Sequence, residues 1–472
     1  MTISNFLRYA FTCWTAAIVL ASCGGNAPSS SLPAARLPFG AQRHTASSPI
    51  KHIVLMIQEN RSFNDLFATF PGADGTTTGQ AVPNSNCSPP ISGGALALKE
   101  MPLVLTKDLN HSWKSGYSIA YDGGKLDAFD LIRFGGVGLF ECTYPYQYTD
   151  PTQVKPYWTL ASQYALAEHM FTTQASDSFT AHQDLIRGGT VVERNKALVD
   201  DPTCGTCWWG CDATPGTATH LITPGNEFVK VGPFPCSNKF KNKYLTLRDR
   251  LDAKSITWMY YAPPSSQIDG KLWSAFDVVY PVRYGPEWTS NISTPETKIL
   301  SDVQSGKLAA VSWVIPEGGN SDHPFTKMGG KYTDNGPEWI ATVVNAIGQS
   351  SYWDSTAIIV VWDDWGGFYD NRAGKLGKYA GPGERVPMLV ISPYAKAGYI
   401  SKTNYEFGSI LKYIEQNWSL GTLNTTDKSS KSIVDCFNYK QSPIPFQPIV
   451  SSLGKSYFMH EKHSYLAPDT DW

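Results

Sequence analysis

The sequence predicts an α/β protein with a mostly parallel central sheet flanked by helices, and two observations lead to this class. From Lys51 onward, short apolar runs alternate with stretches of helical periodicity, which is the pattern of βαβ units. Two of the apolar runs, residues 52–58 and 356–362, end abruptly in pairs of polar residues. Because open α/β sheets bind ligands at the carboxyl ends of their strands, we expect a ligand site at that edge.

The individual elements follow from local pattern. Apolar, β-branched runs predict strands at His52–Gln58, Ile256–Tyr261, Ala309–Ile315, Ala357–Trp362 and Pro387–Ser392. Helical periodicity predicts helices at Tyr157–Met170, Tyr244–Ala253, Pro337–Gly348 and Ser409–Trp418. Residues 72–100 and 191–240 are rich in Gly, Pro, Thr and Cys with little periodicity, and we expect long insertions there that cap the sheet edge.

The N-terminus has the features of an export signal. Arg8 precedes an apolar stretch at residues 10–21 that is too short for a spanning helix. Leu20-Ala21-Ser22-Cys23 resembles the bacterial lipobox, with Cys23 as the lipidated first residue of the mature chain; an ordinary cleaved signal is the alternative. We therefore expect a signal peptide at 1–22, a flexible tether at 23–48 and one domain at 49–472, on a protein anchored to the cell envelope by lipid.

Composition and cysteine content narrow the class further. Lys and Arg total 39 against 41 Asp and Glu, so the chain lacks the basic field that a nucleic-acid partner needs. After removal of Cys13 and lipidation of Cys23, seven cysteines remain: Cys87, Cys142, Cys204, Cys207, Cys211, Cys236 and Cys436. Their clustering around 204–236 would suit zinc, but export favours disulfides, and the odd number leaves at least one thiol over.

Two strand ends carry candidate metal ligands. Glu59 and Asn60 follow the first strand, and Asp363 and Asp364 follow the run at 356–362. Hard divalent cations prefer carboxylate and amide oxygens, and Gly366-Gly367 permits close backbone approach. Either pair alone would be read as helix caps or turn residues. Two pairs at two strand ends favour a metal site, for an ion whose identity stays open.

A group of hydroxyls, Ser176, Ser178 and Thr180, precedes a predicted helix start near Ala181. A helix N-terminus offers free N–H groups to a phosphate, and a hydroxyl beside a metal loses its proton more readily. An N-cap role explains the same residues without any chemistry.

These motifs together resemble the bacterial phosphoesterase family of acid phosphatases and phospholipases C. The resemblance rests on ENRSF at 59–63, SFTAHQ at 178–183, WDDWGGFYD at 362–370 and RVPMLVISPY at 385–394. It implies an alkaline-phosphatase-like, three-layer α/β/α sandwich that uses one divalent metal ion. By the same resemblance Glu59, Asn60, Ser178, Asp363 and Asp364 hold the metal, and Ser178 is the nucleophile that forms a phosphoserine. Because Ser176-Asp177 replaces the family's Gly-Pro, Thr180 is a rival for that role.

Two histidines lie in further motifs of the family. His111 lies in DLNHSW at 108–113 and His323 in SDHP at 321–324. The resemblance implies that both contact the phosphoryl group. Histidine suits proton transfer near neutral pH, so we expect His111 to protonate the leaving group and His323, oriented by Asp322, to stabilise charge; the two roles could be exchanged. Trp365, Asn371, Lys402 and Phe407 stand where many relatives have histidine, which affects substrate preference more than reaction type.

The predicted function is therefore metal-dependent hydrolysis of a phosphate ester. The substrate is a phosphomonoester or a phospholipid, and the lipid anchor mildly favours the second. A surface lipoprotein that binds a ligand on a retained fold without catalysis is the alternative, as is a carbohydrate binder that uses the chain's many aromatic residues.

Overall fold

The computed structural model describes residues 48–135, 141–203 and 208–463. From Ser48 onward these residues belong to one compact unit. The predicted signal peptide, almost all of the predicted tether, and Cys23, Cys204 and Cys207 lie outside the described residues.

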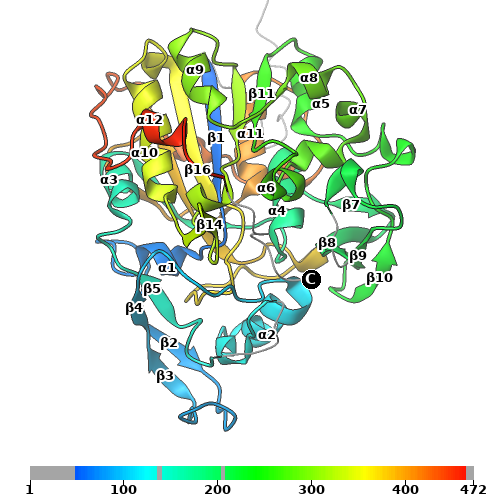
Figure 1. The fold of residues 1–472 in the computed structure, drawn as a ribbon, viewed down its shortest axis with the longest axis vertical. Helices are drawn as coiled ribbons and strands as arrows, with labels where there is room; N and C mark the ends of the chain where they lie inside the picture. Colours follow the sequence, from blue (N-terminus) through cyan, green and yellow to red (C-terminus); the bar gives the residue numbers. More distant parts are fainter. Residues whose placement is uncertain (1–47, 136–140, 204–207, 464–472) are drawn as a thin grey trace, which may run out of the picture. The chain divides into compact units, whose positions relative to one another are not determined.

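A large, mostly parallel sheet forms the centre of this unit (Figure 1). Its strands lie in the order β12 (Ile292–Ser293), β11 (Trp258–Tyr261), β13 (Val311–Val314), β1 (His52–Gln58), β16 (Thr356–Trp362), β17 (Arg385–Ile391), β6 (Ala165–Phe171) and β18 (Tyr399–Ser401), with β19 (Tyr405–Glu406) also on β6. Within these described strands only β17 runs antiparallel to its neighbours. The predicted mostly parallel sheet is confirmed.

Helices cover both faces of the sheet. On one face α3 (Lys155–Gln163) and α9 (Lys298–Gln304) pack against α10 (Gly336–Gly348). On the other, α4 (Ser178–Arg187) packs against α5 (Leu247–Asp252) and α11 (Phe407–Asn417). Figure 1 shows α9 and α10 in front of the sheet and α11 behind it. The predicted α/β/α sandwich is therefore confirmed, and double coverage explains why β1 and β16 are continuous apolar runs.

The other α-helices of the described chain are short. They are α1 (Phe63–Phe67), α2 (Ser118–Tyr121), α6 (Ile268–Leu272), α7 (Tyr280–Arg283), α8 (Glu287–Ser290) and α12 (Lys455–Phe458).

The predicted bounds of strands and helices agree best with the observed bounds for β1 and α10. The predicted strand at 52–58 has the same bounds as β1, and the predicted helix at 337–348 is α10 with one more residue. The helix expected at Tyr157–Met170 is wrong in its second half, because α3 ends at Gln163 and ALAEHMF becomes the fully buried strand β6. Burial between β17 and β18 overrides the helical preference of these residues.

The two insertions contain sheets of their own. In the first, β2 (Thr78–Ala81) pairs with β3 (Gly94–Ala97), and β4 (Lys99–Met101) pairs with β5 (Gln147–Thr149). In the second, β7 (Val191–Glu193), β8 (Lys196–Thr203), β9 (Ala218–Ile222) and β10 (Phe228–Gly232) form a four-stranded sheet. Disulfides join Cys87 to Cys142 and Cys211 to Cys236, whereas Cys436 is a buried free thiol.

A second hydrophobic cluster lies outside the main core. It includes Trp113, Tyr117, Phe129 and Trp365, all buried. These rings meet edge to face: Tyr117 and Phe129 both contact Trp365. The cluster fixes the segment around His111 against the residues that follow β16.

Candidate active site

The ends of β1 and β16 reach the same edge of the sheet at the same level. Gln58 pairs with Trp362, so the next residues, Glu59 and Asp363, leave the two strands side by side. The backbone N–H of Asn60 donates to Asp363 Oδ1 at 3.0 Å. Because the pairs follow adjacent parallel strands, the structure brings together the four residues that the sequence predicts at this edge.

The two chain segments after these strands interlock at Asn60 and Gly366. Asn60 has a φ of 54° and Gly366 a φ of 60°, values in the left-handed region that asparagine and glycine tolerate best. A Cβ at Gly366 would lie 2.2 Å from the carbonyl oxygen of Asn60. Only glycine fits there, as the predicted close backbone approach requires.

Ser178 is the first residue of α4 and lies against both segments. Its Oγ is 3.3 Å from Asn60 Oδ1 and 3.3 Å from Asp364 Oδ2. Thr180, the rival hydroxyl, is buried, and within the described residues its Oγ1 has no hydrogen-bond partner. The contacts with the predicted metal ligands therefore belong to Ser178.

Strand β8 holds the loop before α4 in place. The N–H groups of Asp200 and Asp201 donate to Ser176 Oγ at 2.8 Å and to Asp177 Oδ2 at 3.0 Å. In return, Asp201 Oδ1 accepts from the N–H of Phe179 at 3.3 Å. The second insertion thus contacts the start of α4, and it occupies one of the helix N–H groups expected to be open to phosphate.

The predicted histidines meet at the side-chain amide of Asn60. Asn60 Nδ2 lies 2.9 Å from His111 Nε2 and 3.0 Å from His323 Nε2. The opposite ring nitrogens face backbone carbonyls, with Nδ1 of His111 2.7 Å from Leu109 O and that of His323 2.6 Å from Pro324 O. Each ring therefore donates through Nδ1 and accepts through Nε2. Burial lowers the pKa of His323 to about 3, which keeps it neutral.

Asp322 does not orient His323, contrary to the prediction. Its Oδ2 accepts from Tyr157 OH at 2.8 Å and from Trp362 Nε1 at 2.9 Å. A φ of 71° turns Asp322 away from its neighbour, and the carbonyl of Pro324 orients the imidazole instead. The side chain of Asp322 therefore holds Tyr157 and Trp362 in place and does not contact the imidazole of its neighbour. Trp365 donates from Nε1 to His111 O at 3.0 Å.

A third histidine, not predicted as a ligand, completes the carboxylate group. His182 Nε2 lies 3.0 Å from Glu59 Oε1 and 3.9 Å from Asp363 Oδ2. Ser178 and His182 are four residues apart on α4, so they share one helix face. That spacing is the signal in the sequence that could have identified His182. We call Glu59, His182 and Asp363 the Glu59 group.

The Glu59 group has the chemistry of a metal site. One ligand atom from each of its three residues lies within 4.8 Å of the others. All three are buried, and Asp363 Oδ2 lacks a hydrogen-bond partner among the described residues. Burial lowers the pKa of His182 to about 4, so its imidazole is neutral, the form that binds metals. These residues fit a divalent cation.

Two further buried carboxyl groups, those of Asp364 and Glu384, lie near Asp363. Burial raises the pKa of Asp364 well above its usual range, and the nearby Asp363 adds to the effect. Glu384, directly before β17, is buried as well, and burial also raises its pKa. A cation at this edge would offset this concentration of carboxylates.

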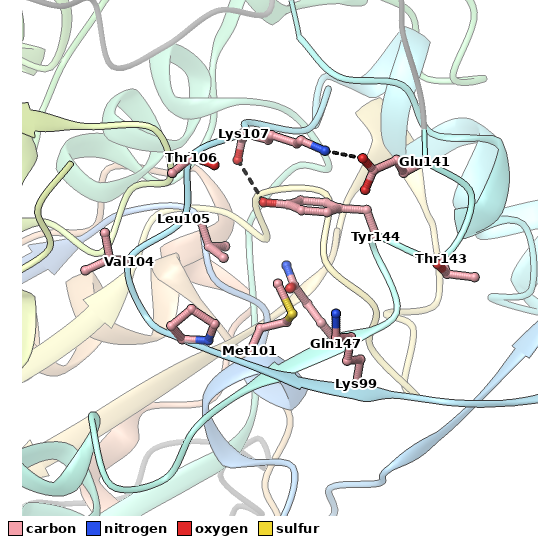
Figure 2. A pocket seen from close by; sticks show the side chains of 11 residues that line it. Lys99, Met101, Val104, Leu105, Thr106, Lys107, Glu141, Thr143, Tyr144 and Gln147 are labelled. Atoms are coloured by element: carbon pink, nitrogen blue, oxygen red, sulfur yellow. Dashed lines mark hydrogen bonds and ion pairs between the residues drawn. The ribbon is translucent and has the colours of Figure 1, made fainter.

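A pocket of about 360 Å³ lies along the segment that precedes His111 (Figure 2). Met101, Leu105 and Tyr144 give it apolar walls, and Tyr144 OH donates to Lys107 O at 3.2 Å. The carbonyl of Leu105 accepts from the N–H of Phe325, two residues after His323. Leu105, one of the residues that line the pocket, is therefore bonded to the loop that carries this histidine.

Sequence comparison identifies relatives along most of the chain. The model of the Phosphoesterase family matches residues 50–421. A "Non-hemolytic phospholipase C" of Pseudomonas aeruginosa is 24% identical over 435 residues, which cover 83% of this chain and 57% of the relative. "Phospholipase C A" of Mycobacterium tuberculosis is 24% identical, covering 85% and 80%. "Non-specific phospholipase C6" of Arabidopsis thaliana is 20% identical, covering 85% and 74%. The chain thus spans little more than half of the Pseudomonas relative.

Solved structures are similar at lower identity. A protein in the alkaline phosphatase superfamily from Vibrio parahaemolyticus is 12% identical with a TM-score of 0.34, over 56% of this chain and 60% of that one. The lipoteichoic acid synthase LtaP from Listeria monocytogenes is 9% identical with a TM-score of 0.39, over 82% and 77%.

Proposed function

The chain belongs to the Phosphoesterase family, and from that membership we propose that it hydrolyses phosphate esters through Ser178 with a divalent metal ion. The observation that carries the proposal is the position of Ser178 Oγ, 3.3 Å from both Asn60 Oδ1 and Asp364 Oδ2. A hydroxyl at a helix start, beside a buried carboxylate and two imidazoles, has the partners that a nucleophile needs.

The metal would be held by Glu59, Asp363 and Asp364, with the oxygens of Asn60 and Ser178 and with His182 as a further donor. When bound, such an ion polarises phosphoryl oxygens and lowers the pKa of a nearby hydroxyl. The adjoining carboxylates and the neutral imidazole of His182 support this assignment.

The chain's own residues supply the remaining steps. Ser178 Oγ attacks phosphorus and its proton passes to the carboxylate of Asp364, 3.3 Å away. An arriving phosphate raises the proton affinity of both imidazoles, because its negative charge favours their cationic form. Asp364 passes this proton to His111 Nε2, which is 3.7 Å from Asp364 Oδ2. His111 then delivers it to the leaving oxygen as the bond between phosphorus and that oxygen breaks, and His323 stabilises the transferred group. Water hydrolyses the phosphoserine and restores the serine hydroxyl.

The substrate that we propose is a phospholipid, cleaved on the glycerol side of the phosphate, because the relatives named above are phospholipases C. The competing substrate is a phosphomonoester. Purified full-length protein should release phosphocholine from phosphatidylcholine faster than phosphate from an aryl phosphate. The reverse preference would identify a phosphatase and leave the serine mechanism intact.

Metal dependence has a direct test. A chelator should abolish hydrolysis of both substrates, and one added divalent cation should restore it, while metal analysis of the active protein identifies the ion. Full activity in chelator, with no metal in the protein, would refute the metal assignment.

Export and anchoring complete the proposal. Among the described residues, no helix combines the length and apolar character that crossing a bilayer requires. Attachment through lipidated Cys23 would instead hold the enzyme at the cell envelope, close to phospholipid. Cys23→Ser should move the protein from the membrane fraction to the soluble fraction; unchanged partitioning would contradict lipidation.

A further inference from the structure

A second set of carboxylates lies at the same edge of the sheet. Glu296 follows β12, Glu317 follows β13, and Glu461 comes from the segment after α12. One carboxylate oxygen from each residue lies within 4.8 Å of the others. We call these three residues the Glu296 group. Glu461 lies beyond the part of the chain that matches the family, residues 50–421, and the three residues differ from those of the Glu59 group.

Glu296 is a deeply buried member of this group. Its side chain is 2% exposed, and across residues 48–135, 141–203 and 208–463 no basic side chain pairs with it. Burial raises the pKa of Glu296 well above its usual range, and the nearby Glu317 adds to the effect. An isolated buried carboxylate is costly, which points to a cation that would offset it.

Two neighbouring oxygens also lack partners. Glu461 Oε2 is buried without a hydrogen-bond partner among the described residues, although Oε1 accepts from Asn320 Nδ2 at 2.7 Å. Asp269 shows the same division: Oδ2 accepts from the N–H of Gly318 at 2.9 Å, and the buried Oδ1 lacks a partner in that part of the chain. The imidazole of His463, 2.7 Å from Glu317 Oε2, is partly exposed.

We propose that the Glu296 group binds a Ca²⁺ ion that fastens the C-terminal segment to the loop before His323. Oxygen-only ligands suit hard cations, and Ca²⁺ accepts irregular sets of carboxylates more readily than Mg²⁺, which demands a nearly octahedral shell. The proposal does not depend on the proposed function, because its three ligands are not among the residues assigned to the serine chemistry.

The consequence for the site follows from the loop between Glu317 and His323. Asn320 contacts Glu461 directly. The next residue, Ser321, accepts the N–H of Glu59 at its carbonyl, at 2.7 Å, and the N–H of His323 at its hydroxyl, at 3.2 Å. An ion on the Glu296 group would therefore stabilise the backbone that positions both Glu59 and His323, without touching a substrate.

Calorimetric titration of CaCl₂ into chelator-treated full-length protein tests the assignment. Glu461→Gln should weaken Ca²⁺ binding about tenfold or more, because it removes one ligand charge, whereas Asp363→Asn should keep this binding event. Glu227→Gln, the same change at an exposed turn, is the matched control. Equal Ca²⁺ affinity in wild type and Glu461→Gln, or absence of Ca²⁺ binding to the wild type, would overturn the proposal.

A second measurement needs no variant. In the wild type, Ca²⁺ should slow proteolytic cleavage between residues 455 and 463 severalfold, since the ion holds Glu461; an unchanged cleavage rate there would also overturn the proposal. Failure of the proposed function is distinguishable, because an inactive enzyme that binds Ca²⁺ through Glu461 leaves this inference standing.

Discussion

Two carboxylate groups lie at one edge of the same sheet, and they are built in different ways. The Glu59 group takes two of its residues from the ends of adjacent strands, β1 and β16, and sits beside a serine and two further histidines. The Glu296 group takes residues from the ends of β12 and β13 and a third from the C-terminal segment. The first combines two carboxylates with an imidazole nitrogen and lies beside a serine hydroxyl, whereas the three residues of the second offer carboxylate oxygens. On the two proposals made above, the same strand-end geometry serves catalysis in one group and structural support in the other.

The largest expected effect comes from removing the serine hydroxyl while the carboxylates around it stay in place. Ser178→Ala should lower turnover on phosphate esters by roughly 1,000-fold or more, because the nucleophile is lost while the surrounding donors remain. Steady-state assays with circular dichroism of the variant check this. Thr180→Val, which removes the rival hydroxyl at nearly constant volume, should keep turnover within a few fold; the opposite result for the pair would transfer the nucleophile's role to Thr180.

Asp363→Asn should break the Glu59 group and leave the Glu296 group unchanged. Its affinity for the catalytic metal should fall by roughly 100-fold, since even substitutions around metal ligands cost about 10- to 100-fold. Metal analysis of the purified variant, with exposed Asp354→Asn as control, measures the loss. Equal metal content in variant and wild type would mean that Asp363 is not a ligand.

His182→Gln sharpens the comparison by testing the nitrogen donor that the Glu296 group lacks. Metal affinity should fall about tenfold, because glutamine can still hydrogen-bond Glu59 but is a poorer ligand than neutral imidazole. Competition against a chromophoric chelator gives the affinity. His460→Gln, at an exposed position, should bind like the wild type. An unaltered affinity in His182→Gln would restrict His182 to orienting Glu59.

The smallest expected effect concerns Asp322, which supports the site without facing it. Asp322→Asn should lower the free energy of unfolding by about 1 to 3 kcal/mol, since the amide satisfies Tyr157 and Trp362 less well. Turnover per folded molecule should change only a few fold. Denaturant unfolding and kinetics measure both. Asp302→Asn, which weakens the bond from Tyr261 OH to Asp302 Oδ2, is a matched control. A large loss of turnover at full stability would return Asp322 to a direct role with His323.

The sequence predicts the position of a site residue best where that residue directly follows a strand defined by its apolar run. Strand β1 ends where its apolar run ends, so Glu59 and Asn60 could be placed at the sheet edge from the pattern alone. The run ALAEHMF could not be assigned, because residues that favour a helix were buried in β6 by their neighbours in the sheet.

Contacts between segments that are far apart in the sequence could not be predicted. The role of His182 was missed although its spacing from Ser178 was visible, since spacing does not show which helix face meets Glu59. Asp322 was assigned to its sequence neighbour, but a left-handed backbone turns it to Tyr157 and Trp362. Glu461 could not be paired with Glu296 at all, because 165 positions of chain (461 − 296) separate two residues that meet only in the folded state.

The close approach of Gly366 to Asn60 has a practical consequence for engineering. Any side chain at Gly366 would collide with the Asn60 carbonyl. The conformation of the turn after β16 and that of the turn after β1 therefore depend on each other. A designer who transplants this chemistry onto another scaffold must graft both turns in a single piece, and libraries that randomise one of them alone should yield almost exclusively inactive clones.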